Sequence, residues 1–280
     1  MTRREVLDRA RGLLSHGKIE DVDLEAELIL RYILNINRAS LFAELGIPLT
    51  TEQEADFWNK IGRRIKGIPS AYITGVREFY GLEFYVDENV LIPRPETELL
   101  VEKAIEISRN YEAPIIVDIG TGCGNIAISL AINLPRAKIY ATDIAQQALN
   151  TARRNCERHN VEKRIQICIG DLLEPITGPF DIIVANMPYV RTADLPAVNT
   201  NGYEPRLALD GGEDGLDVIR RLCVQVEKKL KPGGSLLLEI GIGQKELLVN
   251  YLLSLFPEAK IESFRDLAGI DRVVCMTLPV

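Results

Sequence analysis

From about residue 114 to the end of the chain, short apolar runs alternate with longer segments of helical periodicity. This alternation constrains the fold more than any other feature, because strands separated by helices pair in parallel through crossover connections. The predicted strands lie near residues 115–119, 138–142, 165–169, 181–185, 234–240, 259–265 and 271–278. The predicted helices between them lie near residues 124–133, 145–159, 215–230 and 242–255.

The connection between the last two strands is too short for another crossover. Only residues 266–270 lie between them, whereas a parallel crossover needs roughly a dozen residues or more. We therefore expect the sheet to end in an antiparallel hairpin. Seven strands that end in this way are typical of the methyltransferase variant of the Rossmann architecture, so the predicted fold class is α/β with a seven-stranded Rossmann-like domain.

The chain before residue 96 has a different pattern. Residues 1–70 predict a small helical domain, because apolar residues recur at helical spacing and Thr51, Glu52 and Gln53 begin a capping-box pattern. Residues 71–95 predict a linking β-hairpin with Asp87, Glu88 and Asn89 as its turn. Residues 96–280 then form the larger domain, whose first helix runs to about residue 109. The apolar faces predicted in the helical domain contain Val6, Leu7, Ala10, Leu13 and Leu14, then Leu28, Ile29, Tyr32, Ile33 and Ile36.

Composition excludes several classes of protein. A net charge of −7 and a pI near 5.2 argue against a broad nucleic-acid surface, which needs clustered Lys and Arg. The five cysteines form no Cys-x-x-Cys pair and the two histidines, His16 and His159, are far apart, so we expect no metal site. No apolar run is long enough to span a membrane, and no targeting segment is evident. The expectation is a cytoplasmic protein with reduced thiols.

A glycine-rich turn follows the first strand of the alternating region. Gly120, Thr121, Gly122, Cys123 and Gly124 lead directly into a helix. Glycine permits positive φ and a close approach of the backbone to a ligand, and the helix N-terminus favours an anionic group. A dinucleotide fingerprint would carry its third glycine at position 125, which is Asn here, so the pattern suits S-adenosylmethionine better than NAD. A plain tight turn is the alternative.

Acidic residues end the next two strands. Asp143 follows the second strand, where its carboxylate can accept hydrogen bonds from both ribose hydroxyls. Asp171 follows the third strand, where it can reach an adenine amine, and Leu172 can flank the ring. Because the carboxyl ends of parallel strands line one crevice, these positions together predict a site for S-adenosylmethionine.

The fourth strand ends in Asn186, Met187, Pro188 and Tyr189. The Asn186 side-chain oxygen and the backbone carbonyl of residue 187 are two acceptors side by side, which can hold both hydrogens of one planar –NH2 group. This pair predicts a receptor for an amide or an exocyclic amine. A strand-ending turn without a ligand is the alternative.

The order of these signals resembles the HemK/PrmC-type family of peptide chain release factor glutamine methyltransferases. The resemblance covers most of the chain. The cofactor turn is shared by many methyltransferases, but the other segments together are specific to this family. One position departs, because the family's motif reads Asn-Pro-Pro-Tyr and this chain has Met187 at the first Pro. The segments that carry the resemblance are PSAYITG (69–75), REFYG (77–81), LIPRPETE (91–98), DIGTGCG (118–124), YEPRLALDGG (203–212), EIGIGQ (239–244) and DLAGIDR (266–272).

The resemblance implies an activity and a set of roles. It implies methyl transfer from S-adenosylmethionine, with S-adenosylhomocysteine as product, to the Gln of the Gly-Gly-Gln motif in peptide chain release factors. The four residues 186–189 would be catalytic, Asn186 would also contact the cofactor, and the helical domain would recognise the substrate. Met187 keeps the backbone carbonyl but loses the ring that fixes φ, so a less ordered acceptor is expected.

Two other functions remain open at this stage. An N6-adenine methyltransferase would use the same acceptor pair, although the sequence shows neither a basic surface nor a target-reading domain. A non-catalytic adaptor that binds the cofactor and a partner would explain Met187 as a mark of lost activity. Residues 204–217 are rich in Gly and Asp and predict either a lid or a surface loop.

Overall fold

The computed structural model describes residues 1–17, 19 and 21–280. The chain divides into two compact units, Met1–Val76 and Arg77–Val280. In the described part of the smaller unit, every element before Val76 is a helix, and the connections between them are loops and turns. The larger unit contains the whole of the seven-stranded sheet and all the residues that we predict to bind the cofactor.

The smaller unit is a helical bundle around one apolar core. Thr2 and Thr50 each close a capping box at the start of a helix, with Glu5 and Gln53 as their partners. The second cap was predicted one residue too late, at Thr51. Leu13 and Tyr32 were predicted to face the core, but both are more than 40% exposed. The helices are α1 (Arg3–His16), α2 (Val22–Leu34), α3 (Arg38–Ala43), α4 (Thr51–Ile65) and α5 (Ser70–Thr74).

A short β-hairpin follows the helices, and all of it except Val76 belongs to the larger unit. Its strands are β1 (Val76–Phe79) and β2 (Leu82–Tyr85), and they turn through Tyr80 and Gly81, both at positive φ. Residues 87–89 do form a turn, closed by the Val90 N–H and the Asp87 carbonyl, but their prediction as the hairpin turn was wrong, because residues 90–92 form no strand. Residues 90–92 belong instead to the irregular segment that precedes η1 (Pro95–Thr97) and α6 (Glu98–Ser108).

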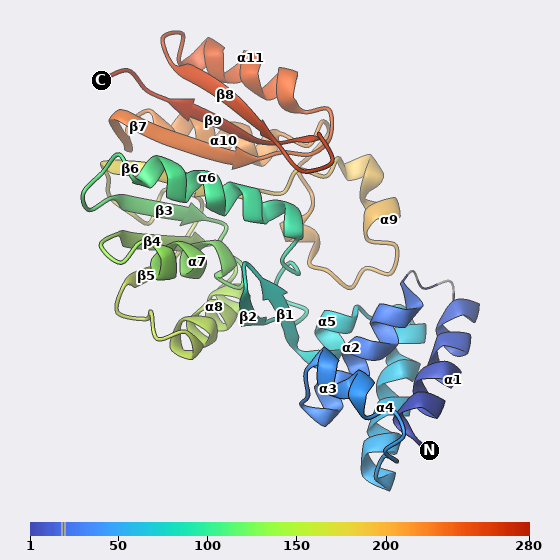
Figure 1. Cartoon of the computed structure of the whole chain (residues 1–280). Helices are drawn as coiled ribbons and strands as arrows, with labels where there is room; N and C mark the ends of the chain where they lie inside the picture. The colour runs from blue at the N-terminus through green and yellow to red at the C-terminus, as the bar shows by residue number, and fades with distance from the viewer. Residues whose placement is uncertain (18, 20) are drawn as a thin grey trace. The chain divides into compact units, whose positions relative to one another are not determined.

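The larger sheet has the strand order β5-β4-β3-β6-β7-β9-β8. Every neighbouring pair is parallel except the two that involve β9, which is antiparallel to both β7 and β8. The predicted fold class and final hairpin are therefore confirmed, and the strand succession is visible in Figure 1. The strands are β3 (Ile115–Ile119), β4 (Lys138–Asp143), β5 (Ile165–Ile169), β6 (Phe180–Ala185), β7 (Leu230–Glu239), β8 (Lys260–Arg265) and β9 (Asp271–Thr277).

Helices cover both faces of this sheet and bury two separate apolar clusters. Because side chains alternate along a strand, Ile182 and Val184 of β6 enter one cluster and Ile183 and Ala185 enter the other. The first cluster is covered by α6, α7 (Asn125–Asn133) and α8 (Gln146–Arg158), which lie together on one side of the sheet in Figure 1. The second is covered by α10 (Asp217–Val226) and α11 (Lys245–Leu255).

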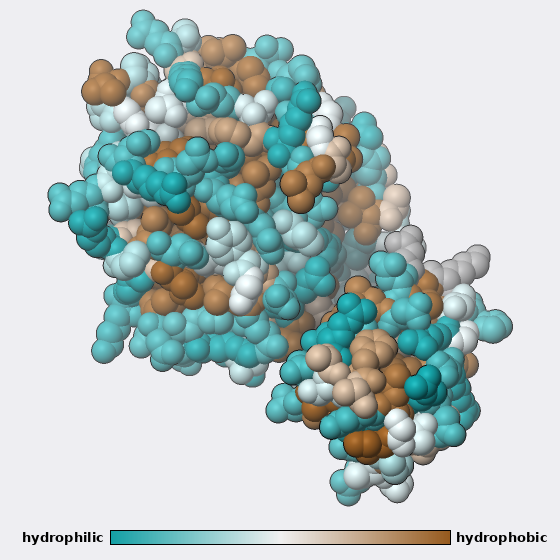
Figure 2. All heavy atoms as spheres, viewed as in Figure 1, coloured by the Kyte–Doolittle hydropathy of each residue, from teal (hydrophilic) through white to brown (hydrophobic). Residues whose placement is uncertain are grey.

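The visible face of the molecule is mostly hydrophilic, with apolar side chains in separate patches (Figure 2). Among the described residues, no helix is both long and apolar enough to cross a membrane. Within that same part of the chain, no three His, Cys, Asp or Glu side chains gather as a metal ion would require.

Candidate functional site

A cavity lies at the carboxyl ends of β3, β4, β5 and β6, where ligands bind in open α/β sheets. It brings together nearly all the residues that the sequence predicts. Two predicted residues do not line it: Gly124 is the N-cap of α7, and Tyr189 lines an adjoining cavity. The predicted residues that do line it are Gly120, Thr121, Gly122, Cys123, Asp143, Asp171, Leu172, Asn186, Met187 and Pro188.

The turn after β3 depends on glycine for steric and conformational reasons. Gly120, Gly122 and Gly124 have φ of 68°, 54° and 85°. A Cβ on Gly120 would overlap the Cε atom of Met187, and a Cβ on Gly124 would lie 3.1 Å from Ile128 Cδ1. Gly124 is the N-cap of α7, so it starts the helix instead of lining the cavity.

Two aspartates hold this turn in shape. Asp143 accepts hydrogen bonds from the backbone N–H groups of Gly122 and Ala145, both at 2.9 Å. Asp118 is fully buried and accepts from Thr121 Oγ1 at 2.7 Å and from the Ala127 N–H at 3.2 Å. Burial raises the pKa of Asp143, and it raises the pKa of Asp118 to about 7. Asp143 therefore shapes the turn as well as facing the cavity.

The third strand end is more constrained than the sequence suggested. Asp171 forms an ion pair with Arg221 of α10, and both residues line the cavity. Leu172 is buried with φ of 50°, an uncommon conformation for a residue with a Cβ, and its carbonyl accepts from Thr142 Oγ1 at 2.9 Å. Arg221 was not predicted, because nothing in the helical pattern of α10 distinguishes it from a solvent-exposed cation.

Asn186 lies immediately after β6 and lines both cavities. Its Nδ2 donates to Thr97 Oγ1 at 3.0 Å, so the opposite end of the amide, Oδ1, points away from Thr97. Thr97 is 1% exposed and precedes α6. The segment LIPRPETE thus supplies a side chain that contacts the strand-end motif, which the sequence alone did not show.

Tyr189 is anchored at both its backbone and its hydroxyl. The hydroxyl donates to Glu239 Oε1 at 3.2 Å, and the carbonyl accepts from Gln244 Nε2 at 2.9 Å. Glu239 is 1% exposed, and burial raises its pKa to about 7. Burial also raises the pKa of Tyr189, with the nearby Glu239 carboxylate as a further cause. The ring therefore stays neutral and fixed.

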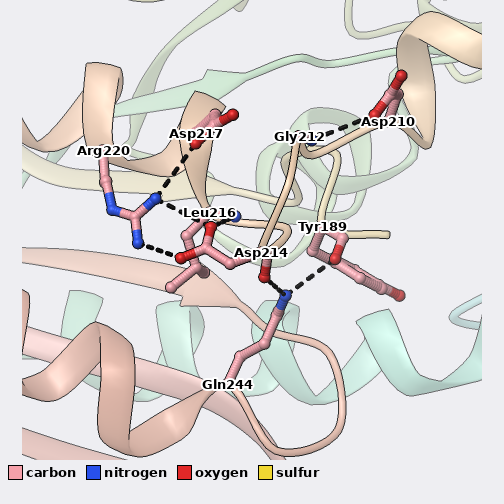
Figure 3. A network of polar contacts seen from close by, with 8 residues as sticks. All are labelled: Tyr189, Asp210, Gly212, Asp214, Leu216, Asp217, Arg220 and Gln244. Carbon is pink, nitrogen blue, oxygen red and sulfur yellow. Dashed lines mark hydrogen bonds and ion pairs between the residues drawn. The ribbon is translucent and has the colours of Figure 1, made fainter. Parts of the chain in front are cut away.

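Residues 204–217 are folded against the motif. Gln244 donates to the carbonyls of both Tyr189 and Asp214, while Arg220 pairs with Asp214 and Asp217 (Figure 3). Gly215 is required here, since a Cβ would overlap both Gln244 Nε2 and the Tyr189 carbonyl.

The other end of this segment is tied to the chain before α6. Glu204 accepts from the Ile92 N–H at 3.1 Å and pairs with Arg94 at 2.5 Å. Because residues 204–217 are bonded at both ends, this segment packs against residues 186–189 and holds them in place in this structure.

A sheet of this order, with a glycine-rich turn after β3 and an acid as the last residue of β4, defines a Rossmann-like S-adenosylmethionine-dependent methyltransferase. Two family models match the chain: the PrmC N-terminal domain at residues 5–75 and the methyltransferase small domain at residues 95–200. A release factor glutamine methyltransferase of Geobacter sulfurreducens is 41% identical over 276 residues, 98% of this chain and 95% of the relative. Its counterpart in Moorella thermoacetica is 42% identical over 274 residues, 97% of each. The chain belongs to the release factor glutamine methyltransferase family.

Solved structures agree on the fold. The catalytic domain of hMettl16, in complex with MAT2A 3′UTR hairpin 6, covers 75% of this chain and 81% of its own, with a TM-score of 0.59 and 18% identity. The predicted family, fold class and enzyme class are confirmed, and the methyl donor is S-adenosylmethionine. The site fits that donor, because Gly120 and Gly122 line the cavity with backbone alone and the Asp143 side chain lines the same cavity.

Proposed function

We propose that this protein methylates the side-chain amide nitrogen, N5, of the Gln in the Gly-Gly-Gln motif of peptide chain release factors. The observation that carries the substrate assignment is the orientation of Asn186, whose NH2 group is engaged by Thr97. The Oδ1 atom is then the end of the amide that can accept a hydrogen bond from a substrate –NH2 group.

The second acceptor is the backbone carbonyl of Met187. The Met187 side chain is 5% exposed and packs over Gly120, which fixes the residue without a proline ring. Two acceptors on adjacent residues orient the substrate amide and favour the positive charge that develops on its nitrogen. Tyr189, held by Glu239 and Gln244, packs on the substrate side chain.

S-Adenosylmethionine supplies a methyl group that is already strongly electrophilic when it is bound. The donor would be held by Gly120, Gly122, Asp143 and Leu172. Asp171 would reach the adenine of the donor after its ion pair with Arg221 opens. The protein's task is to align the amide nitrogen with that methyl group, and alignment in a closed site supplies several kcal/mol. The nitrogen can lose its proton after transfer, so no general base is required.

We also propose that the helical residues 1–70 recognise the release factor, that 71–95 act as a linker and that 96–280 carry the chemistry. The match of residues 5–75 to the PrmC N-terminal domain supports a family-specific role for the helices. The acidic net charge of −7 supports a protein partner over direct binding to nucleic acid, and we place the enzyme in the cytoplasm with the translation machinery.

The test is transfer of labelled methyl from S-adenosylmethionine to a purified release factor. The matched control is the same factor with its motif Gln changed to Ala. We expect label only on the factor that keeps its motif Gln. Equal label on both factors would contradict the assignment of the glutamine, and label on RNA or DNA adenine in a parallel reaction would favour the adenine alternative. Cofactor binding without label on any substrate would favour the adaptor.

A further inference from the structure

Gln244 is a buried polar side chain to which the proposed chemistry gives no step. It is the N-cap residue of α11 and is 7% exposed. A polar side chain at an N-cap commonly accepts from a backbone N–H of its own helix, but Gln244 makes no such bond. Its amide group bonds instead to three backbone groups outside α11, so the side chain has a function other than capping the helix.

The Gln244 amide uses both of its N–H groups and its oxygen. Nε2 donates to the Tyr189 carbonyl at 2.9 Å and to the Asp214 carbonyl at 3.3 Å (Figure 3). Oε1 accepts from the Gly241 N–H at 2.8 Å. Because an amide has two donors at one end and an acceptor at the other, these three bonds fix which way round the group lies. Neither a carboxylate nor an apolar side chain could make all three.

Both polar groups of the peptide unit between Tyr189 and Val190 are bonded. Its carbonyl accepts from Gln244, and its N–H donates to the Leu209 carbonyl at 2.9 Å. Because a peptide unit is planar, these two bonds fix the orientation of the plane and so the backbone that carries the Tyr189 side chain. Of the two bonds, the one from Gln244 is the one that a side-chain substitution can remove.

Gln244 also fixes the backbone that lies against the Tyr189 ring. Its Oε1 holds Gly241, and a Cβ on Gly241 would lie 3.2 Å from Tyr189 Cδ2. Both Gln244 and Tyr189 line the cavity that adjoins the cofactor site, and neither lines the cofactor cavity itself. The contacts of Gln244 therefore act on the substrate side of the site.

We propose that Gln244 is a positioning residue for methyl transfer, which fixes the Tyr189–Val190 peptide and the Tyr189 ring before the substrate amide arrives. This inference rests on the proposed methylation of a glutamine amide, in which Tyr189 packs on the substrate side chain. A small displacement of a group that aligns the substrate lowers the rate of the chemical step by a large factor. The effect of losing Gln244 should therefore appear in kcat and not in the affinity for the cofactor.

Gln244→Met and Arg220→Met separate the positioning of Tyr189 from the general ordering of residues 204–217. Gln244 and Arg220 both bind Asp214, but only Gln244 also binds Tyr189. We expect Gln244→Met to lower kcat about 10- to 100-fold, with the Kd for S-adenosylmethionine within about twofold. Arg220→Met should keep kcat within about threefold of the wild type. An unchanged kcat in Gln244→Met, or an equal loss in the two variants, would overturn the inference.

Gln244→Glu tests which end of the amide matters. The carboxylate can still accept from the Gly241 N–H, but it cannot donate to either carbonyl. We expect kcat to fall at least as far as in Gln244→Met, because a carboxylate oxygen would face two carbonyl oxygens. A kcat close to that of the wild type would show that donation to Tyr189 is not needed and would overturn the inference. Gln244→Met adds no buried charge, so it carries the test if Gln244→Glu does not fold.

Amide hydrogen exchange, measured residue by residue by NMR, gives a readout that does not depend on activity. The Val190 N–H belongs to the peptide unit that Gln244 holds, and the Gly241 N–H donates to Gln244 itself. Both should exchange faster in Gln244→Met than in the wild type, and at the wild-type rate in Arg220→Met. If the wild type fails to methylate the release factor but this pattern is found, the proposed function fails and the positioning of Tyr189 stands. If Val190 exchanges equally in all three proteins, the positioning inference fails alone.

Discussion

Met187 is the residue at which this chain departs from the family's motif, and its surroundings explain how the departure is accommodated. The side chain is 5% exposed, belongs to a core cluster and reaches over Gly120. A flexible thioether can fill such an irregular space. Packing thus replaces the proline ring as the constraint on the carbonyl of residue 187.

Met187→Pro should therefore separate stability from rate. The ring restores a fixed φ, so kcat should stay equal or rise, while the buried space left over Gly120 should lower the free energy of unfolding by about 1–3 kcal/mol. Single-turnover kinetics measures the rate, and urea unfolding measures the free energy of unfolding. Met187→Leu is the matched control, since it conserves volume and adds no ring, and it should keep both rate and stability. A large loss of rate in Met187→Leu would contradict this account.

Gly120→Ala should weaken cofactor binding for two separable reasons. The position has φ of 68°, and a Cβ would overlap Met187 Cε. We expect the Kd for S-adenosylmethionine, measured by calorimetry, to rise at least about 10-fold. Adding Met187→Ala should recover the steric part only. Gly269→Ala is the control, because Gly269 also has positive φ but a Cβ there would meet nothing within 4 Å, and it should leave the Kd unchanged.

Helix α8 connects the hairpin to the cofactor turn through one side chain. Asn155 is fully buried, accepts from the Tyr85 N–H at 2.7 Å and donates to the carbonyls of Tyr85 and Cys123 at 3.0 and 2.8 Å. The sequence indicated the helix but not this role, because the sequence does not show which groups a polar residue on an apolar helix face will contact.

Asn155→Leu should leave those three backbone groups unpaired. We expect a loss of about 3 kcal/mol in the free energy of unfolding and a weaker affinity for S-adenosylmethionine, since the Cys123 carbonyl belongs to the cofactor turn. Asn150→Leu on the exposed face of α8 is the control and should change stability by less than about 0.5 kcal/mol. An equal effect of the two substitutions in urea unfolding would exclude the proposed bridge.

The regular elements of the sheet were predictable because each strand and helix carries its own periodicity. All seven strands and the helices between them were found within a few residues of the prediction, and β7 differs most because it begins at Leu230. The hairpin turn was misplaced, since Tyr80 adopts positive φ without a sequence signal for it. Thr97 and Glu239 could not be assigned roles, because their contacts join segments far apart in sequence.

At the scale of the whole molecule, the stability contributed by two buried carboxyls and the stability contributed by two ion-paired aspartates depend on pH in opposite directions. Burial raises the pKa of Asp118 and of Glu239 to about 7, from ordinary values of 3.8 and 4.5. The folded state then binds more protons than the unfolded state between those values, so stability falls as pH rises through this range. Asp210 and Asp266 have pKa values lowered by hydrogen bonds, so their contribution is lost only in stronger acid.

The urea midpoint of the larger unit should therefore be lower at pH 8 than at pH 5.5. For Glu239 alone the difference between these two pH values corresponds to about 2 kcal/mol, and Glu239→Gln should remove that part of it. Circular dichroism is the suitable probe, because the single tryptophan, Trp58, lies in the smaller unit. A midpoint that rises between the two pH values would show that the two carboxyls are not protonated in the folded state.

The most direct test of the central claim is to locate the methyl group after one turnover. A release factor treated with S-adenosylmethionine and either the wild type or Asn186→Ala would be digested and sequenced by tandem mass spectrometry. We predict one methyl group on the side-chain amide of the motif Gln with the wild type, and a rate about 100-fold lower with Asn186→Ala. A methyl group on another residue, or an unchanged rate in Asn186→Ala, would contradict the assignment of the strand-end Asn as the acceptor that drives transfer.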